Sequence, residues 1–278
     1  FIEAVIRRLC NFFLTNRIIL YPHKVRVSYK KCKDHNYKKL KINSSLLCTQ
    51  NGPKRLKVAT GWLSFTRMPN WKINFNEFEQ YVSLHRWNWL LRSLTDEKEP
   101  ANFSWGLSLV RSWVLTMGFN PKGKARESYS TGERISNLCI FARSINGNWD
   151  SLPDDLSNFV REMGLDLARR VEYNSSKLNG NHIINNARAL MLAGHSTDTP
   201  ELISIARSII SERLEGLTSN GFLVEGSSHY QFLFTRWLLE IGLVAEEKND
   251  KLTTNLIFPY LPSLLEACNF FIIKNKNK

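Results

Sequence analysis

The sequence Asn181-His182-Ile183-Ile184-Asn185-Asn186-Ala187-Arg188-Ala189-Leu190 places polar, proton-handling side chains at the start of an otherwise apolar helical pattern. A second stretch, Gly221-Phe222-Leu223-Val224-Glu225-Gly226-Ser227-Ser228-His229-Tyr230, does the same before the next apolar run. A helix that only fills a core needs no Asn-His pair, further Asn residues and an Arg among Ala, Leu and Met. We therefore expect several of these groups to face a cleft, and the function to lie there.

The first stretch predicts a polar helix end. With Asn181 at the N-cap, Asn185 and Arg188 follow on one face, and His182 and Asn186 lie on an adjacent one. The helix N-terminus adds a partial positive charge and N–H groups, which suit a carboxylate or sulfate ligand. The alternative is that Asn181 is only a cap and Arg188 pairs with an acid.

The second stretch spaces Glu225, Ser227 and Tyr230 around a short turn, with His229 beside the tyrosine. A tyrosine at a helix start often packs its ring and leaves its hydroxyl in water, and Glu225 and Ser227 are also suitable local caps. Because both stretches occur in a helical-hairpin protein, we favour a shared site over these separate structural roles.

Apolar residues recur every three or four positions over most of the chain after residue 76, and strand signals are few. Short loops with Gly, Asn, Pro and Ser favour antiparallel neighbouring helices. Helical hairpins of this kind are compatible with a bundle, a solenoid or a closed α/α toroid. The region around Trp62 is expected to be extended or looped, Asn76 is a candidate cap, and the predicted helices span residues 76–94, 104–117, 132–144, 154–173, 181–192, 200–214, 230–246 and 262–271.

The formal net charge of +13 is concentrated at one end of the sequence. Residues 1–60 hold fourteen Lys and Arg against two acids, a net +12, which leaves +1 for residues 61–278. We therefore divide the chain into a basic N-terminal region, 1–60, and a helical domain, 61–278. Such a block suits nucleic acid, an anionic membrane surface or an acidic polysaccharide, or is a solvated basic arm. No nucleic-acid-binding motif accompanies it, so we do not expect a nucleic acid partner.

The cysteines and apolar runs exclude several classes. Five cysteines without CxxC spacing argue against a disulfide framework and a zinc site, so we expect buried thiols. We predict neither a metal nor a cofactor. The longest apolar runs are interrupted by charges such as Arg7, Arg17 and Glu240, so we predict no transmembrane helix.

Four segments in order resemble the heparinase II/III family of polysaccharide lyases. They are S-L-H-R-W-N-W-L-L at residues 83–91, Y-S-T-G-E-R-I-S-N-L at 129–138, N-H-I-I-N-N-A-R-A-L-M-L-A-G at 181–194 and G-F-L-V-E-G-S-S-H-Y at 221–230. The resemblance is to the N-terminal α/α toroid domain, and especially to heparinase-like proteins found with bacterial surface-polysaccharide genes. It implies an all-α fold, an incomplete (α/α) toroid of antiparallel helical hairpins, and places the chain in the periplasm or cytoplasm of a bacterium without deciding between them.

The family resemblance implies β-elimination on uronic-acid polysaccharides, with an acidic polysaccharide as partner. Asn181 matches the family's Asn that neutralises the substrate carboxylate, and Tyr230 matches its catalytic Tyr. His182 matches the His beside that Asn, as a base or a second carboxylate contact. The resemblance also implies cleft or support roles for Arg188, Glu225, Tyr129, Arg134 and His85, of which the last two are equally suited to bracing helices. Candidate sugar platforms, most of them expected in the core, are Trp87, Trp89, Trp105, Trp113 and Trp237.

Family members continue into a large β-sandwich that adds another wall to the cleft. The sequence ends at Lys278, so we expect a fragment without that domain, whose activity in this truncated form is not assured. The alternative function is a non-catalytic protein that binds acidic glycans in surface polysaccharide metabolism.

Overall fold

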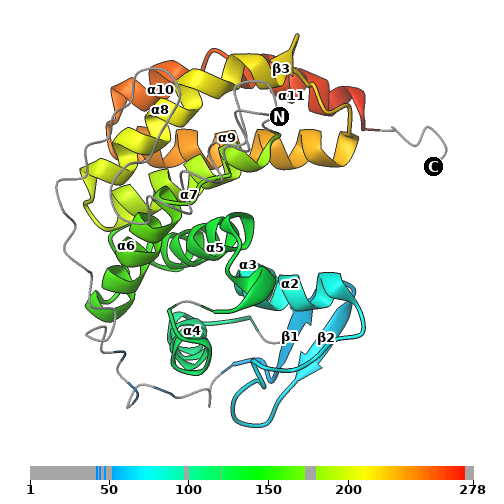
Figure 1. The fold of residues 1–278 in the computed structure, drawn as a ribbon, viewed down its shortest axis with the longest axis vertical. Helices are drawn as coiled ribbons and strands as arrows, with labels where there is room; N and C mark the ends of the chain where they lie inside the picture. The colour runs from blue at the N-terminus through cyan, green and yellow to red at the C-terminus, as the bar shows by residue number, and fades with distance from the viewer. Residues whose placement is uncertain are drawn as a thin grey trace, which may run out of the picture. The chain divides into compact units, whose positions relative to one another are not determined.

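The computed structural model describes residues 52–96, 100–119, 121–172 and 180–272, together with residues 42, 44 and 47. Its regular structure is almost entirely helical (Figure 1). The described residues form two compact units, the first within 168–188 and 204–278 and the second within 37–167 and 189–203. The helices are α2 (Phe78–Arg86), α3 (Asn88–Leu94), α4 (Phe103–Met117), η3 (Gly123–Ala125), α5 (Ser128–Asn146), α6 (Asp154–Ala168), α7 (His182–Ser196), α8 (Pro200–Leu217), α9 (Ser228–Glu247), α10 (Lys251–Ile257) and α11 (Leu261–Phe270).

The second unit starts with a two-stranded antiparallel hairpin. Strand β1 (Arg55–Val58) pairs with β2 (Gly61–Ser64) in a register that sets Lys57 opposite Trp62. The hairpin packs against α2 and α3, and these two helices also pack against α5 (Figure 1). This confirms the expectation of extended chain around Trp62. The pairing itself crosses the division that we drew after residue 60.

The core of the second unit is rich in aromatic residues. The rings of Trp87 and Trp113 lie 5.1 Å apart and those of Trp89 and Trp105 lie 6.1 Å apart, in edge-on contacts that suit aromatic pairs. All four side chains, like Trp237 in the first unit, are fully buried. All five tryptophans considered as sugar platforms are therefore core residues.

The first unit contains a second short hairpin and the C-terminal helices. Strand β3 (Thr218–Ser219) pairs with β4 (Phe222–Leu223), and both α10 and α11 pack against α9. The buried Gln231 side chain of α9 holds this hairpin, since it donates to Gly221 O at 2.9 Å and accepts from Leu223 N at 2.7 Å. The segment just before α9 is therefore fixed to the helix that follows it.

Most predicted helices differ from the structure by a few residues at one or both ends, and two of them differ by more. The helix predicted over 76–94 is divided into α2 and α3 at Trp87, which has a left-handed backbone with φ of 60°. Its cap is Glu77 rather than Asn76, and the helix predicted over 154–173 ends at Ala168. Helix α10 was not predicted.

The expectations for the cysteines and the basic region can be compared with the structure only in part. Cys139 and Cys268 are buried and carry no disulfide, while Cys10, Cys32 and Cys48 lie outside the described residues. Within the basic region 1–60, residues 1–51 also lie outside the described residues, except for residues 42, 44 and 47. The domain division therefore stays a prediction. In the part of the chain that the structure describes, no helix combines the length and apolar character needed to cross a membrane.

Candidate functional site

The N-terminus of α7 forms the first part of the candidate site. Asn181 directly precedes the helix, and its carbonyl oxygen accepts from Ile184 N at 3.0 Å and Asn185 N at 3.3 Å, so it begins the helical hydrogen bonding. Its side chain is buried. Asn181 thus occupies the helix-initiating position that the sequence predicts, but its side-chain amide binds Glu225 instead of capping the helix.

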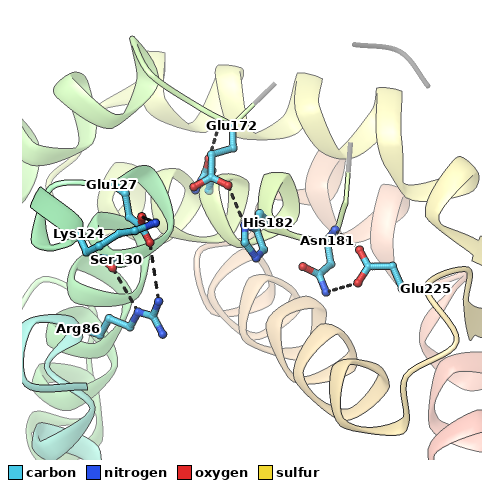
Figure 2. A network of polar contacts seen from close by, with 9 residues as sticks. Arg86, Lys124, Glu127, Ser130, Glu172, Asn181, His182 and Glu225 are labelled. Carbon is cyan, nitrogen blue, oxygen red and sulfur yellow. Dashed lines mark hydrogen bonds and ion pairs between the residues drawn. The ribbon is translucent and has the colours of Figure 1, made fainter. Parts of the chain in front are cut away.

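Asn181 binds a carboxylate through two donors. Its backbone N–H donates to Glu225 Oε1 at 2.8 Å and its side-chain Nδ2 donates to Glu225 Oε2 at 3.0 Å (Figure 2). A Cβ added at Gly180 would lie only 2.8 Å from Glu225 Oε1, so a larger residue at this position would require the carboxylate to shift. The predicted support role of Glu225 therefore has a concrete form: the carboxylate holds the first turn of α7.

The turn that carries Glu225 also leads to Tyr230. Gly226, with φ of +69°, follows Glu225, and its N–H donates to Leu223 O at 3.0 Å. Ser227 then caps α9, because its hydroxyl accepts from Tyr230 N. Tyr230 lies in the first turn of α9 with 40% of its surface exposed. The bond from Asn181 to Glu225 therefore links the start of α7 to the turn that begins α9.

His182 contacts an acid that the sequence reading missed. Its Nδ1 lies 2.7 Å from Glu172 Oε2, and the imidazole is half exposed (Figure 2). Because a carboxylate accepts and does not donate, this bond requires a proton on Nδ1. In the neutral ring, the lone pair then lies on Nε2.

Asn186 explains how Glu172 is held. The buried Asn186 amide oxygen accepts from Glu172 N at 2.8 Å. His182 and Asn186 are four residues apart, and both bind Glu172, as expected for side chains on one helical face. Sequence reasoning found the face but not the acid, which precedes α7 in the chain and carries no motif of its own.

Arg188 braces two helices instead of lining an open surface. It is fully buried, forms an ion pair with Glu240 of α9, and donates from Nη1 to Asn185 Oδ1 at 2.9 Å. Arg236 lies 3.3 Å from the other carboxylate oxygen of Glu240. The alternative in which Arg188 pairs with an acid is therefore the one that the contacts support, and direct binding of a sugar by Arg188 is not supported.

His85 and Arg134 are interior residues of the second unit. His85 Nδ1 accepts from Trp113 Nε1 at 3.0 Å, and burial followed by the nearby Arg134 charge lowers the pKa of His85 to about 4. Arg134 donates to His85 O at 2.7 Å and lies over the Trp113 ring at 4.7 Å. Both residues are fully buried, so the bracing role suits them better than contact with a polysaccharide.

Tyr129, also in the second unit, is half buried and lies beneath Arg86. The Arg86 Cζ atom is 4.6 Å from the centre of the tyrosine ring.

Among the described residues, no group of three or more His, Cys, Asp or Glu side chains is placed to hold a metal ion.

Taken by their fold, the described helices define an all-α protein of the toroid type. No family model matches the chain, and no curated protein matches it. Among solved structures, the crystal structure of heparinase III is similar, with 19% sequence identity and a TM-score of 0.55. The similarity covers 98% of this chain and 44% of that one, so the chain spans less than half the length of that structure. This similarity concerns the fold alone and confirms the predicted fold class.

Proposed function

We propose that residues 61–278 are a polysaccharide lyase-type domain that cleaves a uronic-acid-containing polysaccharide by β-elimination. The observation that carries the proposal is the pair of bonds by which the α7 N-terminus holds the Glu225 carboxylate. The helix end has the donors and the partial positive charge that a uronate carboxylate needs. The fold similarity to heparinase III supports the proposal.

Asn181 is the residue that we assign to the sugar carboxylate. Its side chain is buried, so we assign to the substrate only the second hydrogen of Nδ2, the one that Glu225 does not accept. Removal of the proton on C5 puts a second negative charge beside the carboxylate. A fixed amide donor disperses that charge, an effect usually worth about 3 to 4 kcal/mol for one donor of this kind.

His182 and Tyr230 are assigned to the proton transfers. One of them takes the C5 proton, the electron pair forms the C4–C5 double bond, and the bond from C4 to the glycosidic oxygen breaks. An acid then protonates the leaving oxygen. The Glu172 bond orients His182 as a base at Nε2, and Tyr230, which is partly exposed, is suited to the acid role.

Glu225 and Arg188 stabilise this arrangement without contacting the substrate. Glu225 fixes the amide of Asn181, and Arg188 ties α7 to α9 through Glu240. We assign neither residue to the reacting atoms.

The test is to incubate the chain with uronic-acid polysaccharides and to follow the ultraviolet absorbance of unsaturated products. Asn181→Ala and Tyr230→Phe should each lower the rate by about 100-fold or more. Matched controls are Asn255→Ala, on the exposed face of α10, and Tyr260→Phe, just before α11; both should retain the rate. Undiminished activity in either site variant would refute its role.

The same experiment separates cleavage from binding. A non-catalytic glycan-binding protein would yield no unsaturated product, and its affinity for the polysaccharide would survive Tyr230→Phe. That result would replace the lyase proposal by the binding alternative.

A further inference from the structure

Arg86, which was not among the residues singled out in the sequence, ends α2 in a polar cluster of the second unit. The cluster consists of Arg86, Lys124 of η3, Glu127, and Tyr129 and Ser130 at the start of α5 (Figure 2 shows all of these but Tyr129). None of these five residues is among those assigned to catalysis above.

The Arg86 guanidinium is held in place from several directions. Its Nε donates to the hydroxyl of the buried Ser130 at 3.2 Å, and its Cζ lies 4.6 Å from the centre of the Tyr129 ring. The backbone oxygen of Arg86 accepts from Asn137 Nδ2 at 2.8 Å. A fixed arginine has already lost much of its rotamer freedom, so an anion that binds it causes little further ordering.

The outer edge of this guanidinium has donors to spare. The distance from Nη2 to Glu127 Oε1 is 4.0 Å, which is too long for a hydrogen bond, and Lys124 holds the other Glu127 oxygen at 2.8 Å. Across the ranges that the structure describes, neither Nη atom makes a hydrogen bond, although only 20% of the Arg86 side chain is exposed. A guanidinium has five N–H donors, so four remain for a ligand.

The local charge favours an anion as that ligand. Glu127, the acid nearest to Arg86, is already bound by Lys124, so its negative charge is shared between two cations. The positive end of the 19-residue helix α5 begins beside them, and the Glu127 side chain makes no capping bond to it. A largely buried cation with one distant acid is incompletely compensated, which an incoming oxyanion would correct.

We propose that Arg86, supported by Tyr129 and Ser130, is an oxyanion subsite for the carboxylate or sulfate group of an acidic saccharide. The planar fork of arginine matches two oxygens of such a group, whereas a lysine ammonium acts as a point charge. The saccharide as source of the oxyanion rests on the proposed function, but the oxyanion chemistry stands on the cluster itself. In this proposal, the contact with the Tyr129 ring fixes the position of the Arg86 guanidinium.

The test is a titration of the whole ¹⁵N-labelled chain, with the Arg86 Nε–H resonance as the readout and Arg86→Lys as the variant that assigns it. The probes are glucuronic acid, inorganic sulfate and uncharged glucose. Glucuronic acid should shift the resonance to saturation, and glucose should not. Arg86→Lys should weaken glucuronic acid binding, followed by calorimetry, by about tenfold, and Tyr129→Leu should also weaken it.

The control variant is Arg161→Gln on α6, which removes an exposed arginine of the same unit and should leave the dissociation constant unchanged. Melting curves of all variants show whether a loss of binding is only a loss of folding. Equal affinity in Arg86→Lys and the unmodified chain, or an equal shift with glucose, would overturn the subsite. Binding of sulfate but not of glucuronic acid would overturn the saccharide as its ligand.

Asn181→Ala separates this subsite from the proposed function. It should abolish cleavage but leave the response of the Arg86 resonance to glucuronic acid intact. Cleavage that survives the substitution counts against the lyase proposal alone, whereas an Arg86 resonance that is silent in the unmodified chain counts against the subsite alone.

Discussion

At the scale of single residues, the bond between Glu225 and Asn181 determines how the first turn of α7 is held. Glu225→Ala would leave the buried Asn181 side chain and its backbone N–H without their acceptors. We expect a loss of about 1 to 3 kcal/mol in the free energy of unfolding, because an unsatisfied buried donor costs about that much. Urea denaturation measures this loss.

Glu225→Gln is the informative companion variant. It retains one oxygen acceptor but loses the charge and the second acceptor, so we expect a smaller loss of stability than in Glu225→Ala. Glu215→Ala on α8 removes an exposed acid of the same unit and is the control. If Glu225→Ala were as stable as this control, the carboxylate would not be what holds α7.

His85 predicts a pH dependence of stability. Burial and the Arg134 charge lower its pKa from 6.5 to about 4 in the folded protein, so the unfolded chain binds the proton more readily. The stability that the neutral histidine contributes is present above about pH 6.5 and is lost as the pH falls towards 4, by about 3 kcal/mol in total. Unfolding free energies measured from pH 7 to pH 4 test this.

The His85→Gln variant should lose less stability over that pH range than the unmodified protein. Other groups titrate there too, so the difference between the two proteins is the relevant quantity. His229→Gln, a substitution of an exposed histidine, should keep the original slope. An identical slope in His85→Gln would show that His85 is not the group that resists protonation.

The residues of the site differ in how far the sequence revealed them. The spacing correctly grouped His182 with Asn186 and Asn185 with Arg188, because helical periodicity is a local property. The partners lie on other segments: Glu240 lies 52 positions after Arg188, and Glu172 lies ten positions before His182, at the end of a different predicted helix. Spacing alone therefore predicted which faces are polar, but not which acids they bind.

At the scale of elements, helix ends depend on capping contacts that can be tested directly. Asp250 caps α10: it accepts from Thr253 N at 3.1 Å, and both of its oxygens lie 2.9 Å from Arg207 Nη2. Burial alone would raise the pKa of Asp250. The hydrogen bonds from Thr253 and Arg207 and the Arg207 charge outweigh burial and hold the pKa below its usual value.

We expect Asp250→Ala to lower the unfolding free energy by about 1 to 2 kcal/mol, the usual value of a helix N-cap. Asp250→Asn should lose less, since asparagine also caps helices, but it removes the ion pair with Arg207. Because the folded-state pKa of Asp250 is lowered, its contribution is present above the usual aspartate pKa and is lost as the pH falls below it. Equal losses in both variants would show that the charge, and not the cap, matters.

The elements also show where periodicity is insufficient. Spacing predicts an apolar stripe of Leu156, Phe159, Val160, Met163, Leu167, Ala168 and Val171. The first six are buried along α6, whereas Val171 lies beyond the end of that helix and is half-buried. The pattern over 76–94 was equally regular, yet Trp87 has a left-handed backbone that ends α2 and starts α3. Trp87 packs against Trp113 and Phe159, so tertiary contacts overrode the local helical pattern.

At the scale of the whole molecule, the uneven charge makes its own prediction about binding. Residues 1–51 hold eleven Lys and Arg against two acids, a net +9 of the total +13. This charge acts over about 10 Å at moderate salt and attracts acidic polymers without selecting among them. The arrangement at Asn181 acts only on a group within hydrogen-bonding distance.

A chain that begins at residue 52 should therefore bind an acidic polysaccharide with a weaker salt dependence. We expect the slope of log Kd against log salt concentration to fall by roughly half or more between about 0.05 and 0.3 M salt. A full-length variant with the Lys and Arg of residues 1–51 replaced by Gln should show the same reduced slope, because charge is its cause. The effect of Asn181→Ala should be the same in both backgrounds, since the amide contact is short-ranged. An unchanged slope would instead place the attractive charge within residues 52–278. Tighter binding of DNA than of polysaccharide, lost on truncation, would favour a nucleic acid as the partner of the basic region.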